Sequence, residues 1–366
     1  MKKRMLFILT LAVAVCACCL FASAQDTAPV IQDHIVYELI PATDQAPAHY
    51  EIVSLFDSEE AMQGVTEITI PAELDGVPVT AISCNRNYVY TYKNAEVETI
   101  NLPDTIETIG KLAFAYCNNL KEITLPESVR RIGPQSFANC KQLAQVHLND
   151  GLQIIGKATF DKFTALQYIT LPVSLQAVER RGFTLSGLKS VRIPGSCSVN
   201  DSAFSQAKEL KKVVFENRTN DDTSFIGHSA FSKCVSLLKV YLPKEAPAYN
   251  IGFASFYGCQ KLKAVYRTDS LQSINDSFRD CEALKSFTLP AEIQSIQYMA
   301  FSGCTNLKKL RVLATSPAFL TAERLSAEFL KHMPKGCKIY VKTAEMKDAF
   351  LAAGCTNRVV VKADLA

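Results

Sequence analysis

The sequence predicts an elongated α/β solenoid, and two observations lead to this fold. The same residues return about every 23 positions, and each repeat places them in one order, I-G-x-x-A-F-x-x-C-x-x-L-x-x-I-x-L-P. A period of this length is typical of a chain wound into coils that stack on their neighbours. The frame is marked by nine phenylalanines, spaced 21 to 27 residues apart: Phe114, Phe137, Phe160, Phe183, Phe204, Phe231, Phe256, Phe278 and Phe301.

One repeat shows how each coil is expected to fold. In residues 120–142 apolar and polar residues alternate as far as Pro126, which predicts a short strand with one buried side. Proline has no N–H, so it ends the ladder. A second buried segment at 129–132 and a short helix or tight turn at 136–138 then complete the coil. The fold is therefore a parallel sheet on one side and short helices or turns on the other.

The first 24 residues have the pattern of a secretory signal. A basic start precedes an apolar stretch from Leu6 to Phe21, and Ala22 to Ala24 form a small-residue cleavage site. The alternative is a lipid anchor at Cys18, but the apolar stretch continues past that residue. The sequence therefore predicts an exported protein, either secreted or held at the outer cell surface or in the periplasm, and no membrane span.

The remaining chain divides into three parts. We expect an N-terminal cap at 25–64, the repeats at 65–313 and a C-terminal cap at 314–366, because a solenoid needs its open ends covered. In the last part the patterns predict helices at 322–332 and 344–353, and strands at 338–341 and 359–361.

Charge argues against two classes of partner. The chain has 39 Lys and Arg against 36 Asp and Glu, and the excess of three lies at Lys2, Lys3 and Arg4. The mature chain is therefore neutral overall. Nucleic acids and anionic membranes are bound by neutralising phosphate, so neither is an expected partner.

Six of the 13 cysteines share one position in the repeat, three residues after the phenylalanine: Cys117, Cys140, Cys234, Cys259, Cys281 and Cys304. Other repeats have Phe163, Ser186 or Ala207 there. A position that accepts Phe, Ser or Ala is a packing position, and free cysteine behaves as a small apolar residue. Buried thiols are therefore predicted, with disulfides between adjacent coils as the alternative. This pattern leaves Cys84, Cys197, Cys337 and Cys355 unassigned.

No motif indicates catalysis, a metal or a cofactor. The sequence lacks H-E-x-x-H, the P-loop and G-x-S-x-G, and it has only five histidines. Two matches to S-x-x-K lie at different positions of the repeat and lack their companion motifs. Asp221 and Asp222 lie in the segment 216–223, which contains four residues more than other repeats, but they lack the spacing of a calcium loop. An enzyme is thus a remote alternative.

Outward strand residues are the candidates for binding, since solenoids bind through their open sheet. The candidate set combines tyrosines with basic residues, as protein-binding hot spots do. Its members are Tyr168, Arg192, Lys212, Lys239, Tyr241, Tyr266, Lys309 and Arg311. The alternative is that these are ordinary strand formers and solvated lysines.

Two interruptions of the repeat offer further candidates. Tyr88, Tyr90 and Tyr92 alternate where the usual phenylalanine and cysteine are missing, and they could hold a sugar or a peptide, or cover the first coil. The insertion at residues 216–223 is expected to form a loop, and loops of this kind often lie on a functional side.

The repeats resemble the BspA-type leucine-rich repeat. The resemblance rests on Ile109 to Leu120, Ile-Gly-Lys-Leu-Ala-Phe-Ala-Tyr-Cys-Asn-Asn-Leu, and on the similar segment 296–307, and it covers about residues 65–313. It implies a right-handed, curved leucine-rich-repeat solenoid in a bacterial exported or surface protein. The implied function is adhesion or recognition of a protein on a host or neighbouring cell, with glycan capture as the alternative.

Overall fold

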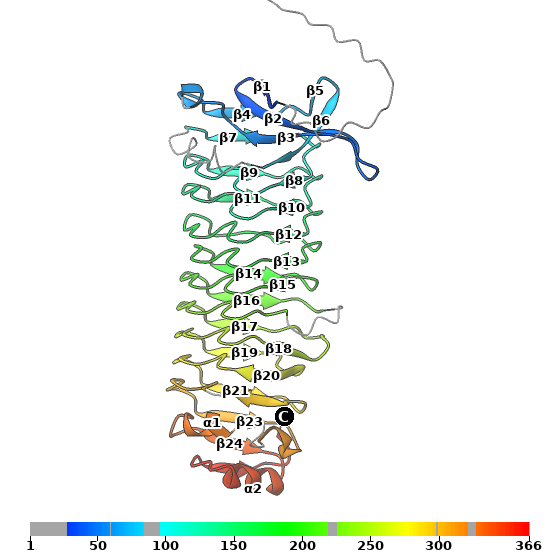
Figure 1. Cartoon of the computed structure of the whole chain (residues 1–366). Helices are drawn as coiled ribbons and strands as arrows, with labels where there is room; N and C mark the ends of the chain where they lie inside the picture. The colour runs from blue at the N-terminus through cyan, green and yellow to red at the C-terminus, as the bar shows by residue number, and fades with distance from the viewer. Residues whose placement is uncertain are drawn as a thin grey trace, which may run out of the picture.

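The computed structural model describes residues 28–58, 60–83, 96–218, 225–297, 299–320 and 327–365. It confirms the leucine-rich-repeat solenoid: Figure 1 shows coils stacked into one column, nearly straight in this view. Each central coil has three sides, formed by one strand, a second and shorter strand, and a turn that carries the repeated phenylalanine. Within these ranges no helix is long and apolar enough to cross a membrane.

The first side, which we call the strand face, runs along the column as parallel strands. Their central residues are buried and the residues on either side point outward, as the alternation predicts. The strands are β4 (Glu67–Thr69), β7 (Thr99–Asn101), β9 (Glu122–Thr124), β11 (Gln145–His147), β14 (Ser190–Ile193), β16 (Lys212–Phe215), β17 (Lys239–Tyr241), β19 (Ala264–Tyr266), β21 (Ser286–Leu289), β23 (Lys309–Val312), β24 (Lys338–Val341) and β25 (Val359–Val361).

Tyr168 is predicted as an outward strand residue, but no strand forms at 168–170, so the strand face is interrupted between β11 and β14, as it is between β7 and β9 and between β19 and β21. The same coil keeps its pairing on the second side, where β13 (Ala177–Val178) pairs with both neighbouring strands. One side of a coil can thus lose its ladder while another side holds it in the stack.

The second side, where the sequence predicts only a buried segment, carries short strands, mostly parallel, and the short helix or tight turn predicted at 136–138 is a turn on the third side. The chain needs only a few residues to cross this side, too few for a helical turn, and an extended segment bonds directly to the next coil. The strands are β6 (Val77–Ile82), β8 (Thr108–Ile109), β10 (Arg131–Ile132), β12 (Ile154–Ile155), β13, β15 (Ser198–Val199), β18 (Tyr249–Ile251), β20 (Leu271–Asn275) and β22 (Ser295–Gln297).

Antiparallel strands lie at the N-terminal end of the column. β1 (Val30–Gln32) pairs with β2 (Ile35–Ile40), which pairs with β3 (His49–Ser54), and β3 joins the parallel series through β6. β5 (Glu73–Leu74) forms a hairpin with β6. A short 3-10 turn, η1 (Glu60–Met62), lies between β3 and β4.

Helices of the described chain are few and lie mainly at the C-terminal end. They are η3 (Pro317–Leu320), α1 (Ala327–Lys331) and α2 (Ala344–Ala352). The Thr343 hydroxyl accepts a hydrogen bond from the Met346 amide, at 3.1 Å, and so caps the first turn of α2. Gly354 follows the helix with φ of +84°, a conformation that glycine adopts without steric cost. The predicted order of helices and strands after residue 322 is therefore observed.

The third side is a turn with left-handed backbone on both sides of the phenylalanine. In most coils the residues two before and two after it have positive φ, as Ala158 and Lys162 do around Phe160. Their amides point along the column: Phe160 N–H donates to the carbonyl of Gly182 at 2.8 Å, and Lys162 N–H to that of Thr184 at 2.7 Å. Left-handed conformations cost energy for these residues, and the bonds to the next coil offset that cost.

The core is a column of stacked phenylalanine rings. All nine repeat rings are buried, and neighbouring ring centroids are 5.0 to 6.0 Å apart. This distance is within the range in which aromatic pairs attract beyond the burial of their area. Each coil thus contributes one ring to the column, which is why phenylalanine returns once in every repeat.

Next to this column lie the cysteines, and the prediction of free buried thiols is confirmed for the described residues. All nine described cysteines are free and buried. Several thiols donate to the carbonyl of the phenylalanine one coil earlier, as Cys259 does to Phe231 at 3.2 Å and Cys304 to Phe278 at 3.0 Å. Cysteine therefore fills the packing position, and its thiol also donates a hydrogen bond to the phenylalanine carbonyl. Alanine at the same position, as at Ala207, has no side-chain donor for that carbonyl.

Truncating one ring should destabilise the whole column. Phe231→Ala removes a fully buried side chain between two stacked rings, and we expect a loss of about 3 to 5 kcal/mol in the free energy of unfolding, measured by chemical denaturation. Phe253→Ala is the matched control, because that ring is 45% exposed and should change stability little. Equal effects of the two variants would contradict the assignment of the core.

The thiols predict a loss of stability in alkali. Burial raises the pKa of Cys234 and of Cys304 from 9.0 to about 12, so the folded chain keeps protons that the unfolded chain releases. Above pH 9 the unfolded state binds fewer protons, and stability should fall as pH rises from about 9 to about 12. Denaturation at a series of pH values measures this fall.

The control for this measurement is Cys234→Ala with Cys304→Ala, since Ala207 occupies the same position in another coil. The double variant should start less stable and lose less stability between these pH values. An equally steep fall in the variant would show that these thiols are not its source.

Candidate binding surface

The register of the strand face brings three of the predicted residues, Arg192, Tyr241 and Tyr266, into one row with Val214. Arg192 on β14 lies opposite Val214 on β16, Val214 lies opposite Tyr241 on β17, and Tyr241 lies opposite Tyr266 on β19. A parallel row begins with Ser190 and continues through Lys212 and Lys239. Because adjacent strands are about 4.8 Å apart, side chains of one row touch their neighbours.

Tyr241 is enclosed by aromatic and cationic groups. Its ring stacks on that of Tyr266, with centroids 4.7 Å apart and planes at 14°. Lys212 Nζ lies 5.4 Å from the Tyr241 centroid and Arg267 Cζ lies 5.7 Å from it. Cations at these distances are attracted by the ring, which orders both side chains and the tyrosine.

A hollow of about 640 Å³ opens beside this cluster. An ion pair lies at one edge, with Arg192 Nη1 3.1 Å from Glu216 Oε1. The hollow has a mixed chemical character, with basic groups around an apolar floor formed by the half-buried Val214. Its lining residues are Arg192, Lys212, Val214, Phe215, Glu216, Asn217, Tyr241 and Arg267. We call this site the basic hollow.

The structure brings some predicted residues together and separates others. Lys239 lies beside Lys212 in the same row, while Lys309 and Arg311 lie on β23, in a separately paired part of the strand face. Tyr168 is 64% exposed and lies beside another hollow of about 800 Å³, with Lys189 Nζ 5.4 Å from its ring centroid. The candidates Tyr88, Tyr90 and Tyr92 lie outside the described residues, as do Asp221 and Asp222.

Sequence reasoning missed Arg267, and its backbone explains why. Strict alternation turns the residue after Tyr266 away from the strand face. Arg267 has φ of +65°, so the chain bends at the end of β19 and the guanidinium returns over Tyr241. No pattern in the sequence marks this bend. The sequence marks Glu216 only as the start of the insertion. It marks Tyr340 only as part of a strand, although Tyr340 lies opposite Arg311 on the strand face.

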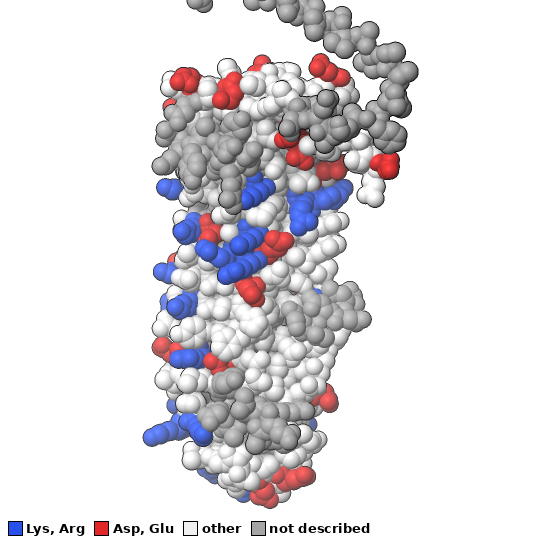
Figure 2. Space-filling model, viewed as in Figure 1, with Lys and Arg blue, Asp and Glu red and all other residues white. Residues whose placement is uncertain are grey.

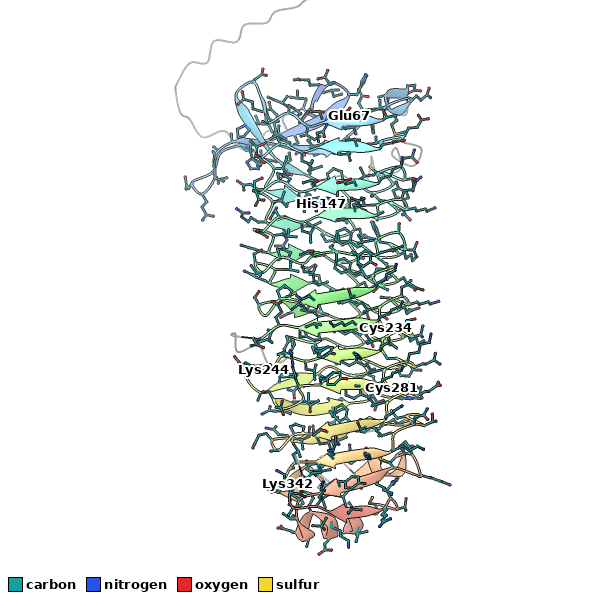
Figure 3. All side chains as sticks on the ribbon, turned by 180° about the vertical axis from the view of Figure 1, so that it is seen from behind. Glu67, His147, Cys234, Lys244, Cys281 and Lys342 are labelled. Carbon is teal, nitrogen blue, oxygen red and sulfur yellow. The ribbon has the colours of Figure 1, made fainter. Side chains whose placement is uncertain are left out.

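Charge along the strand face changes sign with position. In the N-terminal strands β4, β7, β9 and β11 the charged residues are both acidic, Glu67 and Glu122. Glu122 Oε1 lies 2.9 Å from His147 Nε2. Figure 3 shows Glu67 and His147 near the N-terminal end. From β14 to β24 every charged strand residue is basic: Arg192, Lys212, Lys239, Lys309, Arg311 and Lys338.

Elsewhere the charges are mixed. Figure 2 shows basic and acidic side chains next to one another at the level of β10 to β13. Arg181 Nη2 lies 2.6 Å from Asp161 Oδ2, and Arg131 Nη2 lies 3.8 Å from Glu179 Oε1. Burial raises the pKa of Asp161, and the Arg181 cation opposes that rise. Such neighbouring pairs cancel locally, unlike the basic residues of the strand face.

The aromatic and basic side chains of the basic hollow suit the binding of a partner. Among the described residues no group of three His, Cys, Asp or Glu side chains is placed to hold a metal ion. The largest rises in pKa belong to buried thiols and tyrosines of the core, where burial disfavours the charged form.

Solved structures of similar fold come from bacteria. A leucine-rich cell surface protein from Faecalibacterium prausnitzii is 20% identical, with a TM-score of 0.43, and the alignment covers 93% of this chain and 96% of that one. A leucine-rich repeat protein from Bacteroides ovatus is 21% identical, with a TM-score of 0.47 and coverage of 91% and 99%. The pneumococcal vaccine antigen PcpA is 18% identical, with a TM-score of 0.45 and coverage of 92% and 98%.

No functionally curated protein is significantly similar to the chain. The family model for the BspA type leucine rich repeat region matches six copies, over residues 86–211 and 224–318. These two segments make up more than half of the chain and contain β14, β17 and β19, while β16 lies between them. The chain therefore belongs to the BspA-type leucine-rich-repeat family.

Proposed function

We propose that this chain is an exported, non-catalytic binding protein that recognises a protein partner through its strand face. The observation that carries the proposal is the stacked pair Tyr241 and Tyr266, held beside the basic hollow by Lys212 and Arg267. Ordered aromatic side chains next to arginine are typical of the residues that contribute most to protein interfaces. Leucine-rich-repeat proteins are generally binding scaffolds, which agrees with this role.

Export is proposed from residues 1–24, with cleavage after Ala24. The basic start and small-residue site support secretion to the outside, the cell surface or the periplasm. Mass spectrometry of the mature N-terminus tests this, because an acylated Cys18 would instead indicate a lipid anchor. Residues 25–64 and 314–366 are proposed as the two caps around the repeats at 65–313.

Glycan binding is the second candidate function, and a different place on the strand face favours it. Tyr168 exposes 64% of its surface beside a hollow whose lining includes Gln145, His147, Gln167 and Thr170. An exposed ring with amide and hydroxyl groups around it can stack on a sugar and hydrogen-bond its hydroxyls. Tyr168→Ala should then abolish any oligosaccharide binding.

The proposal predicts that both stacked tyrosines contribute to binding and little to folding. The double variant Tyr241→Ser and Tyr266→Ser should weaken binding to the protein partner by at least about thirtyfold, because hot-spot truncations cost at least about 2 kcal/mol. Its free energy of unfolding should change by less than about 1 kcal/mol, since both rings lie at the surface. A matrix-protein and glycan array, followed by titration of the proteins that bind, measures the first effect.

Tyr257→Ser is the matched control, because that tyrosine also lies between two cations, Lys233 and Arg279, but on the turn side of the column. Its binding should equal that of the unaltered chain. Unchanged binding of the double variant would reject the strand face as the site, and a set of ligands made only of oligosaccharides would favour the glycan candidate.

A further inference from the structure

We infer that the basic hollow and the strands around it bind an acidic segment of the partner protein, with aspartate or glutamate carboxylates as the recognised groups. The inference rests on the proposed function and names the partner's chemistry at the same surface. Four observations support it: the sign of the charges along the strand face, the covering of both sides of the Tyr241 ring, the weak ion pair at the edge of the hollow, and the apolar floor.

Charge complementarity is the first argument. The hollow is lined by three cations, Arg192, Lys212 and Arg267, and by one carboxylate, Glu216. Lys239 stands next to Lys212 on the adjoining strand. A group of like charges along one surface attracts segments of the opposite sign and increases the rate at which they associate. A neutral mature chain thus still presents one basic surface.

The Tyr241 ring decides between an anion and a neutral sugar. β17 lies between β16 and β19, so Lys212 approaches the ring from one side and Tyr266 covers it from the other. A sugar ring needs a free aromatic face for stacking, and Tyr241 has none. The hollow instead offers ammonium and guanidinium donors, which carboxylates accept in charge-assisted hydrogen bonds.

The ion pair at the edge shows how a carboxylate can enter. Arg192 is bonded to Glu216 at 3.1 Å, but the two side chains are 68% and 37% exposed. Pairs exposed to this extent contribute little to stability. A carboxylate of the partner can therefore replace that of Glu216 on the guanidinium, which has the planar donor arrangement that carboxylates match. Glu216 competes with the ligand in the free protein.

The apolar floor favours a polypeptide over a sulfated polysaccharide. The half-buried Val214 lines the hollow between the cations, and Tyr266 is 40% exposed next to it, whereas the Phe215 ring turns into the core. Acidic peptide segments carry aliphatic side chains that can cover such a floor, whereas a sulfated polysaccharide has only polar groups to place there. The acidic strand residues Glu67 and Glu122 repel the same ligand, which confines it to the half of the face from β14 to β24.

The test uses the mature chain and a fluorescein-labelled peptide of about 12 residues in which glutamate and leucine alternate. We expect binding that weakens with added salt, and none of the lysine and leucine peptide of equal length. Lys212→Glu with Arg267→Glu should weaken binding at least about tenfold, by replacing attraction with repulsion. Glu216→Gln should strengthen it about threefold, by freeing Arg192.

Lys157→Glu is the control for charge, because Lys157 is exposed at the end of the short-strand side, away from the hollow. It changes net charge half as much as the double reversal and should leave binding unaltered. If Lys157→Glu lost about half of the binding free energy that the double reversal loses, binding would respond to net charge alone and the inference would be overturned.

Two further outcomes separate this inference from the proposed function. If heparin binds and the glutamate peptide does not, the ligand is a sulfated glycan and the inference is wrong. If the partner identified on the array loses affinity in the tyrosine double variant but keeps it after Lys212→Glu and Arg267→Glu, the strand face still binds and only the acidic ligand is rejected. If both the tyrosine double variant and the Lys212→Glu, Arg267→Glu variant lose affinity, the proposed function and the acidic ligand are both supported.

Discussion

The whole structure depends on stacking one coil on the next. A repeat of about 23 residues cannot enclose its own phenylalanine, leucine and isoleucine side chains, so each coil is buried by its two neighbours. The contacts that achieve this are the phenylalanine column, the parallel strands on two sides, and the amides of the turns. Residues with left-handed backbone, such as Ala158 and Lys162, are kept in place by bonds to the following coil.

Stacking also determines which residues are free to vary. Every interior position must match the same position one coil away, and cysteine fits because its thiol fills a small space and donates to a phenylalanine carbonyl. The outward strand positions have no such requirement. Arg192, Val214, Tyr241 and Tyr266 occupy equivalent positions on successive strands, and their different side chains form one continuous surface. A regular core thereby carries an irregular surface, which is what a binding protein requires.

The same freedom explains which part of the site could be predicted. Alternation in a strand was enough to place Arg192, Lys212, Tyr241 and Tyr266 on one side of the sheet. It could not find Arg267, because a positive φ after the strand reverses its direction. It also placed a strand at 168–170, where the sheet is interrupted, since the apolar pattern records burial and not hydrogen bonding. Interruption of one ladder is tolerated because the other sides of that coil remain paired.

The sequence by itself determined the period, the solenoid, the interior residues and the outward strand positions, because burial and strand alternation leave a direct record in the order of apolar residues. Only the tertiary structure decided that Tyr241 is covered on both sides, that Arg192 is paired with Glu216, and that Arg267 joins the hollow. These contacts join residues 24 to 29 positions apart, one coil from the next, and depend on backbone bends and side-chain directions that no periodic pattern specifies.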